Sequence, residues 1–111
     1  MKIKIKLTRH RVEALYMGYQ RIMAEAAGNL CDDHEQLLLE LAITMRHRLA
    51  DMLKSDREKY TIVLTSVEAL AFVQLWAAVP TERGSLICVT VASFIEQIDK
   101  MSSESALKNA F

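Results

Sequence analysis

The sequence contains few of the residues that interrupt secondary structure or build specialised sites. Its 111 residues include one proline and three glycines, and the isolated glycines exclude a glycine-rich phosphate loop or a dinucleotide fingerprint. Two cysteines, Cys31 and Cys88, are too few for a disulfide framework and lack the paired spacing of a zinc site. We therefore expect no metal, no other cofactor and a reducing, cytoplasmic location.

The chain also lacks net charge and a long apolar run. It has 14 basic and 14 acidic residues, so any electrostatic function must come from a local excess of one sign. The longest apolar stretch, 67–79, contains Gln74 and stops at Pro80, well short of the ~20 residues that cross a bilayer. The charged, alternating start at 1–8 differs from a secretory segment. We expect a soluble protein without membrane contact.

Two different periodicities organise the sequence. Residues 2–8 alternate lysine or threonine with apolar residues, and 59–65 repeat this period of two, which predicts two half-buried strands. Apolar residues at helical spacing predict four helices, with Gly28 and Pro80 ending the first and third. The expected helices span about 8–27, 32–54, 66–79 and 85–101. The predicted fold is α+β, mostly helical, with a two-stranded sheet and two antiparallel helical hairpins in the order β-α-α-β-α-α.

Short matches indicate an internal duplication. Leu-Thr at 7–8 recurs at 64–65, and Val-Glu-Ala-Leu at 12–15 recurs at 67–70. A duplicated unit relates its copies by a pseudo-twofold axis, near which we expect the two strands to pair. The predicted boundaries are 1–57 and 58–101 for the repeat units, 1–101 for a single domain and 102–111 for a flexible C-terminal tail.

The third and fourth expected helices carry more apolar surface than a small protein covers easily. A helix that is apolar all round must be covered all round, and tryptophan is enriched at protein interfaces. The leading prediction is therefore a non-enzymatic interaction module that forms a homodimer through these helices, with another protein as a further possible partner. The predicted interface residues are Phe72, Leu75, Trp76, Val79, Val91 and Phe94.

An alternative prediction is a nucleic-acid-binding or polyanion-binding accessory protein. The triplet Arg-His-Arg occurs at 9–11 and again at 46–48, and an antiparallel hairpin is expected to bring position 10 across from about position 50. Clustered cations bind phosphate, although such triplets also occur as ordinary solvated helix surface. The predicted binding residues are Lys2, Lys4, Lys6, Arg9, His10, Arg11, Arg46, His47 and Arg48.

No residue pattern indicates catalysis. Cys31, Asp32 and His34 cluster without metal-ligand spacing, and acidic residues at such a position more often cap a helix. Glu13 and Glu68 lie at equivalent points of the two halves, where a first-turn glutamate usually favours the helix dipole. We therefore predict no catalytic and no metal-binding residue.

Overall fold

Two strands and four helices follow one another in residues 2–26, 32–79 and 81–110, which the computed structural model describes. The elements are β1 (Lys2–Thr8), α1 (Arg9–Ala26), α2 (Asp33–Leu53), β2 (Lys59–Thr65), α3 (Ser66–Ala78) and α4 (Leu86–Ala110). This is the mostly helical α+β fold that the periodicities predict. The expected helix stop at Gly28, the residue Cys31 and the expected helix end at Pro80 lie outside the described residues.

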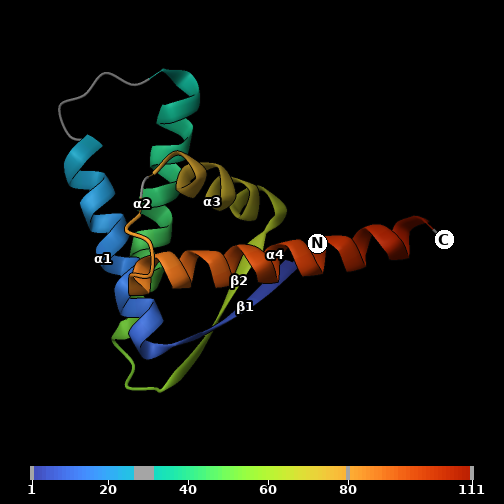
Figure 1. Cartoon of the computed structure of the whole chain (residues 1–111), viewed down its shortest axis with the longest axis horizontal. Coiled ribbons are helices and arrows are strands. Elements are labelled where there is room, and N and C mark those ends of the chain that lie inside the picture. The colour runs from blue at the N-terminus through green and yellow to red at the C-terminus, as the bar shows by residue number, and fades with distance from the viewer. Residues whose placement is uncertain (1, 27–31, 80, 111) are drawn as a thin grey trace.

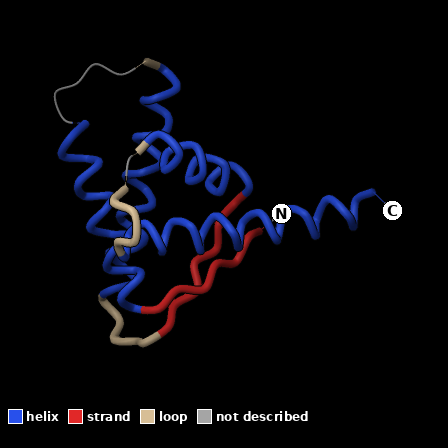
Figure 2. Tube along the Cα trace, in the orientation of Figure 1, coloured by secondary structure: helices blue, strands red, loops and turns tan. Residues whose placement is uncertain are grey.

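The sheet consists of β1 and β2 in antiparallel pairing, with Lys2 opposite Thr65 and Thr8 opposite Lys59. Both strands alternate between buried and exposed residues, because successive side chains of a strand point to opposite faces. The helices pack on the apolar face, and the two strands run side by side along the margin of the molecule in Figure 2. The apolar face consists of Ile3, Ile5, Leu7, Tyr60, Ile62 and Leu64.

The helices cover this face by packing on one another as well as on the sheet. α1 and α2 form an antiparallel hairpin, whereas α4 runs back in the direction opposite to α3 and crosses α1 (Figure 1). Phe72 of α3 stacks on Phe94 of α4 with ring centroids 3.9 Å apart. Trp76 donates a hydrogen bond from Nε1 to the Tyr19 hydroxyl (3.3 Å). Burial raises the pKa of that hydroxyl well above its ordinary value, and the hydrogen bond with Trp76 opposes the rise.

Helix α4 continues to Ala110, beyond the predicted end at about residue 101. The residues from 102 to 110 are Ser-Ser-Glu-Ser-Ala-Leu-Lys-Asn-Ala. None of them is glycine or proline, the two residues that most strongly stop a helix. The last turns of α4 extend beyond the rest of the molecule in Figure 1. The polar composition of this segment was therefore a poor indicator of where the helix ends.

The sheet has a local twofold axis, as every antiparallel pair of strands does, and a duplication would relate its two copies by this axis. Ile5 pairs directly with Ile62. When the two halves are aligned with Leu7 on Leu64, Ile5 and Ile62 are also equivalent positions. A half-turn about the Ile5–Ile62 pair therefore exchanges the two strands. The duplication itself stays a prediction.

Gly18 of α1 faces Trp76 of α3 and Ile87 of α4. A Cβ atom at this position would lie 2.9 Å from the Ile87 Cδ1 atom and 2.9 Å from the Trp76 Cη2 atom. Contacts this short require a neighbour to move, and the Trp76 ring is buried. The absence of a side chain at Gly18 therefore permits the packing of α4.

Replacing Gly18 with alanine should destabilise the protein, although the same change at an open helix position gains about 1 kcal/mol. We expect a net loss of about 1–2 kcal/mol, because overpacking outweighs the propensity gain. Urea unfolding measures the change. Ile87→Val removes one of the two close atoms. The G18A/I87V double variant should therefore lose at least about 0.5 kcal/mol less unfolding free energy than the two single variants lose in sum. Additive changes, or a more stable G18A protein, would contradict the close approach.

Candidate functional site

The face of the sheet that the helices leave uncovered is basic. We call it the open sheet face. It consists of Lys2, Lys4, Lys6 and Thr8 from β1 and Lys59, Thr61, Val63 and Thr65 from β2. Val63 is half-buried and the others are exposed. None of these side chains, all in the described part of the chain, is acidic or aromatic.

The charge of the open sheet face is not neutralised locally. Its four lysines form no ion pair with the residues that the structure describes. The whole chain has a formal net charge of zero, so this face is a local excess of positive charge. Lys59 was missed by the sequence prediction, although the period of two in 59–65 places it on the same side as Thr61.

A hollow of about 430 Å³ lies at the end of the open sheet face where β1 leads into α1. We call it the basic hollow. Three cationic side chains surround it, because the register places Lys59 opposite Thr8 and Lys6 opposite Thr61. Its lining residues are Lys6, Leu7, Thr8, Arg11, Lys59, Tyr60 and Thr61. Arg11 also donates a hydrogen bond to the Ser93 hydroxyl of α4 (3.3 Å), which fixes its direction.

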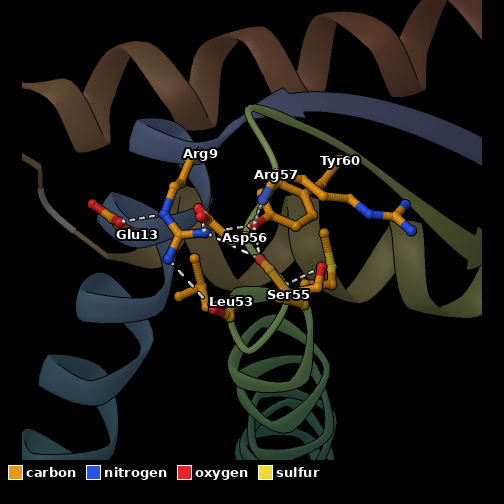
Figure 3. Close-up of polar contacts among 8 residues, drawn as sticks. Arg9, Glu13, Leu53, Ser55, Asp56, Arg57 and Tyr60 are labelled. Atoms are coloured by element: carbon orange, nitrogen blue, oxygen red, sulfur yellow. Dashed lines mark hydrogen bonds and ion pairs between the residues drawn. The ribbon is translucent and has the colours of Figure 1, made fainter.

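Arg9 was predicted to bind anions, but its half-buried side chain forms hydrogen bonds and an ion pair with other groups of the protein (Figure 3). It donates to the Tyr60 hydroxyl (2.7 Å), the Ser55 carbonyl (3.1 Å) and the Leu53 carbonyl (3.4 Å). It also pairs with Glu13 at 3.2 Å. These contacts join the start of α1 to the end of α2 and to β2. Arg9 is therefore a structural clamp.

Arg48 has a similar structural role at the free edge of β2. Its guanidinium group donates to Glu68 of α3 (3.0 Å) and to the Val63 carbonyl of β2. Arg9 lies opposite Leu53 and Ser55, whereas the prediction put position 10 across from about position 50. The second triplet therefore lies at least one helical turn before the residues that Arg9 contacts, and Arg9 and Arg48 share no partner among the described residues.

The remaining residues of the triplets lie on the helix surfaces. His10 and His47 are exposed, and Arg46 is half-buried. They do not line the basic hollow. Of the nine predicted cations, the structure therefore gathers Lys2, Lys4, Lys6 and Arg11 along the sheet, uses two arginines internally and leaves the other three apart.

The predicted dimer interface is mostly core. Phe72, Trp76, Val91 and Phe94 are buried within the protomer, and Leu75 and Val79 pack partly buried against the same core. α3 packs against the sheet, α2 and α4, which bury Ala69, Ala71, Phe72 and Trp76 within the protomer. Among the described side chains of these two helices, the large apolar ones that remain exposed are Val67, Leu70, Leu86 and Val89.

The acidic residues considered for chemistry have structural partners. Asp32 caps α2 by accepting a hydrogen bond from the Glu35 amide (2.7 Å). Glu13 pairs with Arg9, whereas Glu68 pairs with Arg48 and completes a capping box with Thr65. In the described part of the chain, no group of three or more potential ligands is arranged around a metal position. No described helix is both long and apolar enough to cross a membrane.

The sequence matches no protein-family model, and neither curated proteins nor solved structures show significant similarity to it.

Replacing Arg9 with lysine should destabilise the protein by about 2–3 kcal/mol. Lysine keeps the charge, but an ammonium group lacks the planar fork that reaches Glu13, Tyr60 and two carbonyls together. Arg21→Lys is the matched control, since the contact described for Arg21 is an exposed ion pair with Glu25 (3.2 Å) in α1. This control should change stability by less than about 0.5 kcal/mol. Urea unfolding compares the two. An equally small loss for both would show that Arg9 is not a clamp.

Proposed function

We propose that the protein binds nucleic acid, or a polyanion of similar charge density, through the open sheet face. The observation that carries this proposal is four exposed lysines with no acidic neighbour on that face and no ion pair to a described residue. Lysines that neutralise phosphates release condensed counterions, which is the main source of such affinity. The proposal keeps the predicted N-terminal strand and Arg11, adds Lys59, and leaves out the other residues of the two arginine triplets.

The basic hollow adds a directed cation to this face. The guanidinium of Arg11 is held by Ser93 beside Lys6 and Lys59, and a guanidinium forms paired hydrogen bonds with phosphate oxygens. The hydroxyl group of Thr8 at the same hollow is a further donor to phosphate. These groups favour an oxyanion at the end of the sheet next to α1.

The first test removes charge from the open sheet face. Lys4→Gln, Lys6→Gln and Lys59→Gln together should weaken binding to a DNA duplex and make the slope of log Kd against log salt shallower by about 2–3, because each lost phosphate contact contributes about 0.9. Fluorescence anisotropy across a salt series measures both. Arg21→Gln, Arg46→Gln and Arg83→Gln remove the same charge elsewhere and should leave the slope unchanged. Equal losses in the two triple variants would contradict a site on the sheet.

A second candidate function is self-association, through exposed residues rather than through the predicted ones. Val67 and Leu70 are 64% and 58% exposed, and their spacing of three places them on one face of α3. Leu70 also borders a hollow of about 220 Å³, which Val73 and Ile98 help to line. A second copy that covers this face would remove apolar surface from water.

Light scattering after size exclusion tests the second candidate. The wild-type protein should have twice the protomer mass, and the V67E/L70E variant should have the protomer mass, since two buried carboxylates oppose association. Met17→Glu, which changes a residue that is 67% exposed on α1, should stay dimeric. A wild-type protein at the protomer mass would rule this candidate out.

A further inference from the structure

The two strands form a ribbon whose dimensions suit one kind of nucleic acid. Each strand has seven residues, so the ribbon is about 20 Å long, and its strands lie about 4.8 Å apart. The major groove of B-form DNA, about 12 Å wide, admits a two-stranded β-ribbon. The major groove of an RNA duplex is too narrow and deep to be read by side chains. Single strands are bound by stacking on aromatic side chains, and the open sheet face has none.

The side chains of the open sheet face suit base edges as well as phosphates. Lysine ammonium groups donate to the acceptors of guanine, and threonine hydroxyls donate or accept. Val63 is the single apolar residue on the face, and a small apolar side chain fits the thymine methyl group. The face therefore carries the groups of direct sequence readout without a carboxylate that would repel the backbone.

The register arranges these groups with approximate twofold symmetry. Lys2 pairs with Thr65 at one end of the ribbon, and Thr8 pairs with Lys59 at the other. A half-turn about the Ile5–Ile62 pair exchanges these two lysine–threonine pairs. The central pairs, Lys4–Val63 and Lys6–Thr61, do not match in this way. Twofold protein symmetry is mirrored by palindromic symmetry in the DNA site.

The edges of the ribbon are held by helices. Gln97 of α4 accepts a hydrogen bond from the Lys6 amide (3.1 Å) and donates one to the Lys6 carbonyl (3.3 Å). Arg48 of α2 donates to the Val63 carbonyl on the opposite edge. Lys6 and Val63 are equivalent in the predicted duplication. These contacts fix the ribbon and occupy edge groups that a further strand would need, so the face rather than the edge is the binding surface.

From this shape, chemistry and symmetry we propose that the ribbon enters the major groove of B-form DNA and reads a pseudo-palindromic site. The separation of the two end pairs, about 20 Å, corresponds to a site of about six base pairs at 3.4 Å each. The inference rests on the proposed function, because it names the ligand of the open sheet face.

The experiment compares four probes by fluorescence anisotropy at one salt concentration. The protein first selects a preferred site from a pool of random DNA duplexes. The four probes are then a DNA duplex that carries this enriched site, an RNA duplex of the same sequence and length, one strand of the DNA duplex, and heparin. We expect tenfold or tighter binding to the DNA duplex than to the other three, and an enriched site with inverted symmetry. Binding of all four in proportion to their charge would overturn the major-groove inference and leave the proposed function standing. Binding of none would overturn both.

A substitution that leaves the charge unchanged distinguishes base recognition from electrostatic attraction to the DNA backbone. Thr61→Val should weaken binding to the enriched site about tenfold, the loss expected of one base contact, and leave binding to a random DNA duplex unchanged. Thr44→Val, on the surface of α2, should change neither. A T61V protein that loses no affinity for the enriched site would contradict base contact at Thr61.

Discussion

The pairing register of β1 and β2 is the constraint on which the rest of the structure depends. With Ile5 opposite Ile62, the apolar residues of both strands except Val63 point to the helices, and every lysine points away. Because side chains alternate along a strand, a slip of one residue in one strand would turn its apolar set to water and its polar set into the core. A slip of one residue would therefore abolish the open sheet face and the basic hollow.

Three polar side chains stabilise that register in addition to the hydrogen bonds between the two strands. Gln97 and Arg48 satisfy backbone groups on the two free edges of the sheet. Arg9 closes the end of the ribbon by joining α1 to Ser55 and Tyr60. Arginine suits such positions because its planar group forms several hydrogen bonds in fixed directions. The consequence for function is a division of the cations: two arginines maintain the fold, and the lysines stay available to a ligand.

The sequence predicted the parts of this fold that depend on local periodicity. Both strands begin and end where the alternation does, and their lysine face follows from the same pattern, Lys59 included. Periodicity does not predict which residues of two neighbouring helices lie side by side. The prediction therefore placed Arg9 opposite the wrong residues of α2. The burial of Phe72 and Trp76 was missed for a related reason. Periodicity reveals that a helix is apolar all round, but it does not reveal which neighbours cover it.

A two-stranded ribbon formed by one chain can carry different residues at symmetry-equivalent positions, which a ribbon formed by two identical chains cannot. Two identical strands related by a true twofold axis would present the same residue at equivalent positions. Here Lys2 and Lys59 are equivalent and identical, whereas Lys6 and Val63 are equivalent and different. The ends of the open sheet face are therefore symmetric and its centre is not. If α3 also associates with a second copy, it does so through Val67 and Leu70, which lie outside the open sheet face. Each ribbon would then contact one DNA site, and the number of associated copies would set how many sites are bound together.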